Sequence, residues 1–206
     1  MLNILSNFVI LAFNFIFSMT ALPELYFKTD IEWRAWLEIN HSISNGVHLI
    51  FYKVASSKPS MRWEEAVKVA LCFGWIDSTV RKIDDERRRQ YFCPRNERSV
   101  WSKLNKTHIE LLLTNNQIHE SGFKKIEIAK QNGSWTALDA VENGTIPEDL
   151  QKAFSLHTEA YKNYQNFAPS YRKSYLYWLN QAKREETRNN RILQIIELCN
   201  KNKKSR

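Results

Sequence analysis

The chain has 206 residues, of which 43% are hydrophobic, 13% aromatic and 25% charged, and its formal net charge is +8. This length can bury a substantial core, and five glycines with five prolines are too few for a linker or a disordered chain. Three cysteines without CxxC spacing disfavour a disulfide framework or a zinc ribbon, so a reducing compartment is expected.

Residues 1–22 form an apolar leader that contains no charged side chain. Three interpretations are open: a secretory signal or membrane anchor formed by residues 1–21, a helix of the core, or translation that begins at Met19. A secretory signal needs a basic first region and a small-residue cleavage site, and both are weak here. Three asparagines also disfavour a membrane-spanning helix. We therefore favour the start at Met19 and expect a cytoplasmic protein without stable membrane insertion.

Residues 23–140 predict an α+β region. Thr29 and Glu32 have the spacing of a capping box, and residues 47–53 are rich in the β-branched and aromatic side chains typical of strands. The polar residues 84–87 separate two further segments of strand-like composition and predict a hairpin. The predicted elements are a helix from Thr29 to about Asn40, strands at 47–53, 75–83 and 88–93, and helices at about 63–74, 101–113 and 123–133.

Residues 145–200 predict helices only. Pro147 and Pro169 lie where helices begin, and apolar residues then recur at helical spacing as far as Cys199. Residues 201–206 predict a basic tail. The expected fold class is therefore α+β, with a small antiparallel sheet that contains a hairpin and is packed by helices, followed by an all-helical C-terminal part.

Two segments contain the whole excess of positive charge. Residues 81–106 contain nine basic and four acidic groups, and residues 172–206 contain ten and three. Such regions attract phosphate, nucleic acid or anionic lipid through a long-range field. The alternative is a solvated surface that ends in a lysine-rich tail.

The first basic segment and its flank supply several candidate ligand contacts. An aspartate beside a tryptophan can act as an acid, a base or an anchor for a cation, or it can cap a turn through backbone N–H groups. Basic and amide groups next to aromatic rings suit phosphate, carboxylate or single-stranded nucleic acid. The candidates are Trp75, Asp77, Arg95, Trp101, Lys103 and Asn105.

The second basic segment adds candidates at helical spacing, where two arginines on one turn can clamp an oxyanion. They are Lys183, Glu186, Thr187, Arg188 and Arg191. We expect this helix to pack against the hairpin, so that Arg95 and Arg188 line one basic-aromatic pocket. The alternative for the charged members is ordinary surface ion pairing.

No pattern in the chain indicates a reaction. Cys72 and Cys93 are flanked by apolar and aromatic residues and are expected to serve packing, and the five histidines show no metal-ligand spacing. The chain has no glycine-rich phosphate loop, GxSxG elbow or dinucleotide fingerprint. We predict no metal, no cofactor and no catalytic residue, although an enzyme assembled from distant segments stays open.

Five segments together resemble one known family. They read TDIEWRAWLEINH, ALCFGWIDSTVRKID, CPRNERSVWSKLNK, IPEDLQKAF and YWLNQAKREETRNNRI, and they extend from Tyr26 to Cys199. In this order they are similar to the YdeI/OmpD-associated family, also called bacteriocin-protection proteins. The resemblance implies a bacterial protein with a role in stress or tolerance of antimicrobial peptides and an association with an outer-membrane protein, without an agreed active site.

Three functional classes follow. We favour a non-enzymatic tolerance protein that binds an anionic small molecule or a protein partner at the basic-aromatic pocket. The second class is a nucleic-acid-binding protein, whose affinity would fall steeply with salt. The third is an enzyme acting on a small anionic substrate, which requires an enclosed cavity with perturbed titrating groups.

Overall fold

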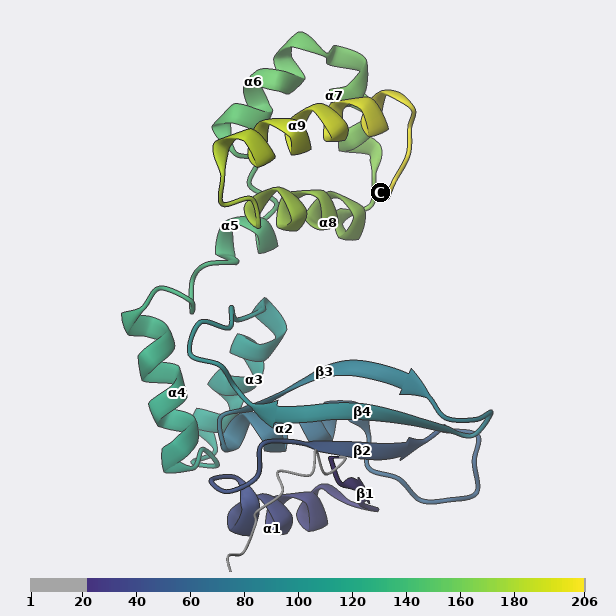
Figure 1. Cartoon of the computed structure of the whole chain (residues 1–206), viewed down its shortest axis with the longest axis vertical. Coiled ribbons are helices and arrows are strands. Elements are labelled where there is room, and N and C mark those ends of the chain that lie inside the picture. The colour runs from purple at the N-terminus through teal and green to yellow at the C-terminus, as the bar shows by residue number, and fades with distance from the viewer. Residues whose placement is uncertain (1–21, 206) are drawn as a thin grey trace, which may run out of the picture.

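The structure is a computed structural model and describes residues 22–205, so the apolar leader at 1–21 lies outside the described residues. Two hydrophobic cores follow one another along the long axis of the molecule, an α+β core and an all-helical core, and the short helix α5 (Asp139–Glu142) lies between them (Figure 1). The predicted fold class is therefore confirmed. No helix in the described part of the chain is both long enough and apolar enough to cross a membrane.

Four strands form one sheet in the order β1-β2-β4-β3. They are β1 (Glu24–Tyr26), β2 (Val47–Tyr52), β3 (Trp75–Lys82) and β4 (Arg87–Pro94). The hairpin of β3 and β4 is present as predicted, and β2 also pairs with β4 in the antiparallel sense. β1, however, pairs with β2 in parallel, so the sheet is mixed and the prediction of an antiparallel sheet is wrong at this edge. A three-residue strand is too short to show a period in the sequence.

The sheet has two chemically different faces. Residues of β2 are alternately buried and half-buried, and the buried ones, such as Leu49 and Phe51, point to the inner face that α1 and α2 cover. The β4 residues opposite them, Gln90 and Arg88, belong to the same face. Described helices do not cover the outer face (Figure 1). A register shift between Asp77 and Val80 brings Val80 opposite Gln90 and thus also onto the inner face.

The inner face is packed by α1 (Asp30–Asn40) and α2 (Trp63–Cys72). The hydroxyl of Thr29 accepts the backbone N–H of Glu32, as the capping-box spacing predicts. The buried indole of Trp33 donates to the carbonyl of Ala66 over 3.1 Å and joins the two helices. Burial of this donor with a partner avoids the cost of an unpaired polar group.

Two further helices, α3 (Lys103–Thr114) and α4 (Glu120–Gln131), complete the α+β core (Figure 1). α4 approaches the end of α2 closely at Gly122. A Cβ atom at this position would lie 2.2 Å from the carbonyl oxygen of Cys72. Glycine is therefore required by the packing of α4 on α2, although its backbone is helical.

The all-helical part consists of four helices after α5. They are α6 (Glu148–Leu156), α7 (Thr158–Asn166), α8 (Pro169–Asn180) and α9 (Glu185–Asn200). Pro147 immediately precedes α6 and Pro169 is the first residue of α8, where the fixed φ of proline favours helix initiation. Leu150, Phe154 and Ile195 are completely buried in the core that these helices share.

Candidate anion-binding groove

Trp75 and Asp77 are the first two candidate ligand contacts. Both side chains form hydrogen bonds with other residues of the protein. Trp75 is 1% exposed, and its indole N–H donates to the carbonyl of His41 over 3.1 Å. Asp77 accepts hydrogen bonds from the indole of Trp63 and from the side-chain amide of Gln90. The Trp75 ring therefore belongs to the core, and the Asp77 carboxylate connects α2 to the sheet.

Arg95 and Trp101 contact one another, as expected for a basic-aromatic pair, but both are buried. The guanidinium lies over the indole at 3.7 Å from the ring centroid, and Nη2 donates to the carbonyl of Val100 over 2.6 Å. Arg95 is only 3% exposed, and its Nε and Nη1 lack a partner among the described residues. Burial lowers the pKa of Arg95 to about 10, while the charge of Asp77 opposes this shift. The pair fixes the loop before α3.

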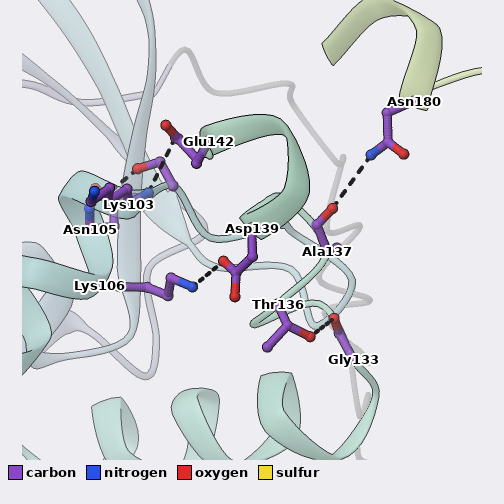
Figure 2. Close-up of polar contacts among 10 residues, drawn as sticks. Lys103, Asn105, Lys106, Gly133, Thr136, Ala137, Asp139, Glu142 and Asn180 are labelled. Carbon is purple, nitrogen blue, oxygen red and sulfur yellow. Dashed lines mark hydrogen bonds and ion pairs between the residues drawn. The ribbon is translucent and has the colours of Figure 1, made fainter. Parts of the chain in front are cut away.

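Lys103 and Asn105 lie where the two cores meet (Figure 2). The backbone N–H of Lys103 donates to the carboxylate of Glu142 over 3.3 Å, and Lys106 pairs with Asp139. Both acidic residues belong to α5, so this helix is held against the positive N-terminal end of α3. The backbone N–H of Asn105 donates to the serine that caps α3.

The C-terminal candidates lie on α9 and on the loop before it. Arg188 makes two hydrogen bonds to the carboxylate of Asp149 on α6, which lowers the pKa of that carboxyl and raises the pKa of the guanidinium. Arg191 donates to the carbonyl of Trp178 over 2.5 Å and lies over its ring. Lys183 and Glu186 are exposed and Thr187 is half-buried.

The two basic segments do not form one pocket. α9 packs against α6, α7 and α8, and Figure 1 shows it at the opposite end of the molecule from the β3–β4 hairpin. Arg95 lies in the α+β part and Arg188 in the helical part, and each guanidinium has its partners within its own part. The expected joint pocket is therefore wrong. Charge similarity between distant segments does not determine which helices pack together.

A different hollow, which no sequence pattern indicates, lies at the open end of the inner face. We call it the hairpin groove, and its volume is about 520 Å³, within the range of small-molecule sites. It is bordered by the end of β2, the loop that leads into α2, and the hairpin. Its lining residues are Phe51, Tyr52, Lys53, Val54, Met61, Arg62, Trp63, Val80, Lys82, Arg87 and Arg88.

The hairpin groove combines an apolar surface with positive charge. Five of its lining residues are Lys or Arg, and none of the described lining residues is acidic. Lys82 and Arg87 pair with acidic residues of the hairpin turn. Lys53, Arg62 and Arg88 make no ion pair within residues 22–205. These three cations are therefore available to an anion.

Arg88 is the most informative of these cations. It lies on the inner face opposite Phe51, and its guanidinium lies over the phenyl ring at 5.5 Å from the centroid. The side chain is exposed although its strand position points toward the core side of the sheet. The strand register shows that Lys82 and Arg88 occupy inward positions of β3 and β4, where apolar residues would continue the core.

Two family models match separate parts of the chain. Residues 25–125 match one described as Domain of unknown function (DUF8412), and residues 143–202 match one described as Bacteriocin-protection, YdeI or OmpD-Associated. The resemblance stated from the sequence is confirmed for the helical part. The match to this family covers residues 143–202, and the α+β part matches the other model. Comparisons with curated proteins and with solved structures gave no match.

Proposed function

We propose, from the similarity of residues 143–202 to the bacteriocin-protection, YdeI or OmpD-associated family, that the protein is a bacterial tolerance protein that binds an anionic ligand in the hairpin groove. The observation that supports the ligand is the combination of three cations without ion pairs and an apolar floor in one groove. The similarity and the groove lie in different parts of the chain, so the tolerance role and the ligand are tested separately.

The chemistry of the groove favours an amphiphilic anion. Val54 and Val80 are 79% and 48% exposed along its sides, which suits an acyl or aromatic body, and the almost fully buried Phe51 and Met61 lie beneath them. Arg88 and Arg62 suit a carboxylate or phosphate head group. A small inorganic anion would leave the apolar surface in water and gain little from it.

Isothermal titration with dodecanoate tests this ligand class. We expect binding by the wild type, and a loss of at least about tenfold, or 1.4 kcal/mol, in Arg88→Ala. Arg81→Ala is the matched control, because it removes the same charge from the same hairpin on the outer face. Dodecanol, which has the same chain without the charge, should bind more weakly than dodecanoate. Equal losses in the two variants would exclude the groove.

Challenge of cells with bacteriocins tests the tolerance role. Deletion of the gene should lower survival, and the wild-type gene should restore it. If Arg88→Ala restores survival fully, ligand binding in the groove is not needed for tolerance.

We also infer a cytoplasmic location. Support comes from Cys72, Cys93 and Cys199, which are all free thiols. Mass spectrometry of the native N-terminus checks this inference, because a start at Met19 agrees with it and a start near Leu22 after export contradicts it.

A further inference from the structure

The outer face of the sheet differs from the groove in both shape and chemistry. Every second residue of β2 and of β4 is half-buried, and these residues point to the outer face. They include aromatic rings and arginines. A small hollow of about 210 Å³ lies on this face. It is lined by Leu22, His48, Thr79, Arg81, Arg89 and Tyr91.

Like charges are paired across two strands at this hollow. Arg81 on β3 is directly opposite Arg89 on β4. Such a pair is unfavourable unless an anion compensates it. Glu24 on β1 pairs with Arg89, whereas Arg81 is exposed and makes no ion pair in the described part of the chain. Arg81 is therefore the member of this pair that is available to an external anion.

Aromatic rings lie beside these arginines. His48 is directly opposite Tyr91, and their ring centroids are 5.3 Å apart. Nδ1 of His48 is buried without a hydrogen-bond partner among residues 22–205. At the opposite edge of the same face, β1 adds Tyr26, whose ring lies 5.3 Å from that of Tyr52. Rings and cations therefore extend across the strands instead of forming one deep pocket.

We propose that the outer face binds single-stranded nucleic acid, with a phosphate at Arg81, next to the Arg89–Glu24 pair, and a base against Tyr91 and His48. Charge complementarity and aromatic stacking are the two interactions by which open sheets hold unpaired strands. The hollow is smaller than a typical site for a whole small molecule, so it accommodates one base or phosphate of a longer chain.

Fluorescence anisotropy with a labelled oligothymidylate 15-mer tests the proposal on the full chain. We expect Arg81→Ala to weaken binding at least about fivefold and Arg81→Glu to weaken it further, because each removes a phosphate contact. Arg88→Ala should change affinity less than about twofold, because it lies on the inner face. Circular dichroism establishes that each variant is folded, which is expected since Arg81 is exposed.

An abasic 15-mer of equal charge separates stacking from simple charge attraction. We expect it to bind at least about tenfold more weakly than oligothymidylate. Equal binding of the two strands, or equal effects of Arg81→Ala and Arg88→Ala, would overturn the proposal. Because the groove is tested with dodecanoate and depends on Arg88, either site can fail without affecting the other.

Discussion

The indole N–H of Trp63 donates to the carboxylate of Asp77 over 2.9 Å, and this bond connects the first residue of α2 to β3. The side-chain amide of Gln90 donates to the same carboxylate oxygen. Because Trp63 lines the hairpin groove, Asp77 fixes the position of one groove wall. The sequence predicts a ligand contact at Asp77, and the structure places it directly behind a residue that lines the groove.

Asp77→Ala should destabilise the protein and also weaken dodecanoate binding. Two donors lose a charged acceptor, so we expect the free energy of unfolding to fall by about 1.5–3 kcal/mol in urea titrations. Asp85→Ala is the control, because this carboxylate is on the exposed turn of the same hairpin. Equal stability of the two variants would show that the Trp63–Asp77 bond does not fix α2 to the sheet.

The Arg188–Asp149 pair should stabilise the helical part rather than hold a ligand. A double-mutant cycle with Arg188→Ala and Asp149→Ala should give a favourable coupling of at most about 1 kcal/mol, because both groups are partly exposed. The exposed Lys152–Glu148 pair on α6 provides a weaker reference cycle. A coupling near zero for Arg188 and Asp149 would leave the arginine free for a ligand, as its spacing in the sequence predicts.

Gly122→Ala should be more damaging than an ordinary glycine substitution. Its new Cβ would collide with the carbonyl of Cys72, so we expect a loss of about 2 kcal/mol or more. Gly144→Ala is the comparison, because Gly144 has open space around it but a φ of +72°, which costs about 1 kcal/mol. If Gly144→Ala is the less stable variant in thermal melts, the close approach of α4 to α2 is incorrect.

Glu142 should make the stability of the junction between the cores depend on pH. A hydrogen bond from Lys173 on α8 lowers the pKa of Glu142 below its ordinary value of 4.5. The stabilisation is therefore present above 4.5 and is lost as pH falls through the lowered pKa.

Comparison with Glu142→Gln isolates this contribution from other carboxylates. The wild type should be more stable than the variant by less than about 1 kcal/mol at neutral pH, given partial solvent screening. The difference should shrink toward zero in strong acid. A difference that stays constant with pH would mean that the Lys173–Glu142 ion pair contributes nothing.

Local signals in the sequence were sufficient for most helices and strands. The Thr29 cap, the proline at the start of α8 and the hairpin between β3 and β4 each depend on neighbours in the chain, and each is confirmed. β1 was missed because only its pairing with β2 makes it a strand. Local patterns do not contain that information.

The candidate site was harder to predict, because it depends on packing between distant segments. Trp75 and Arg95 stand out in the sequence, but burial assigns them to the core. Arg88 has the same local signals, and only its register opposite Phe51 reveals that it faces the inner side beyond the end of the core. Consecutive arginines in a strand therefore point to both faces of the sheet, and the pairing of the strands determines which arginine lies on which face.

Quenching of tryptophan fluorescence by bromododecanoate tests the hairpin groove most directly, because bromine quenches only an indole that the acyl chain contacts. Trp63 is the one tryptophan among the described residues that line the groove. We predict saturable quenching in the wild type and its loss in Trp63→Phe. The control variant Trp178→Phe, which changes a tryptophan of α8, should retain the quenching. Unchanged quenching in Trp63→Phe would contradict an amphiphilic anion in the groove.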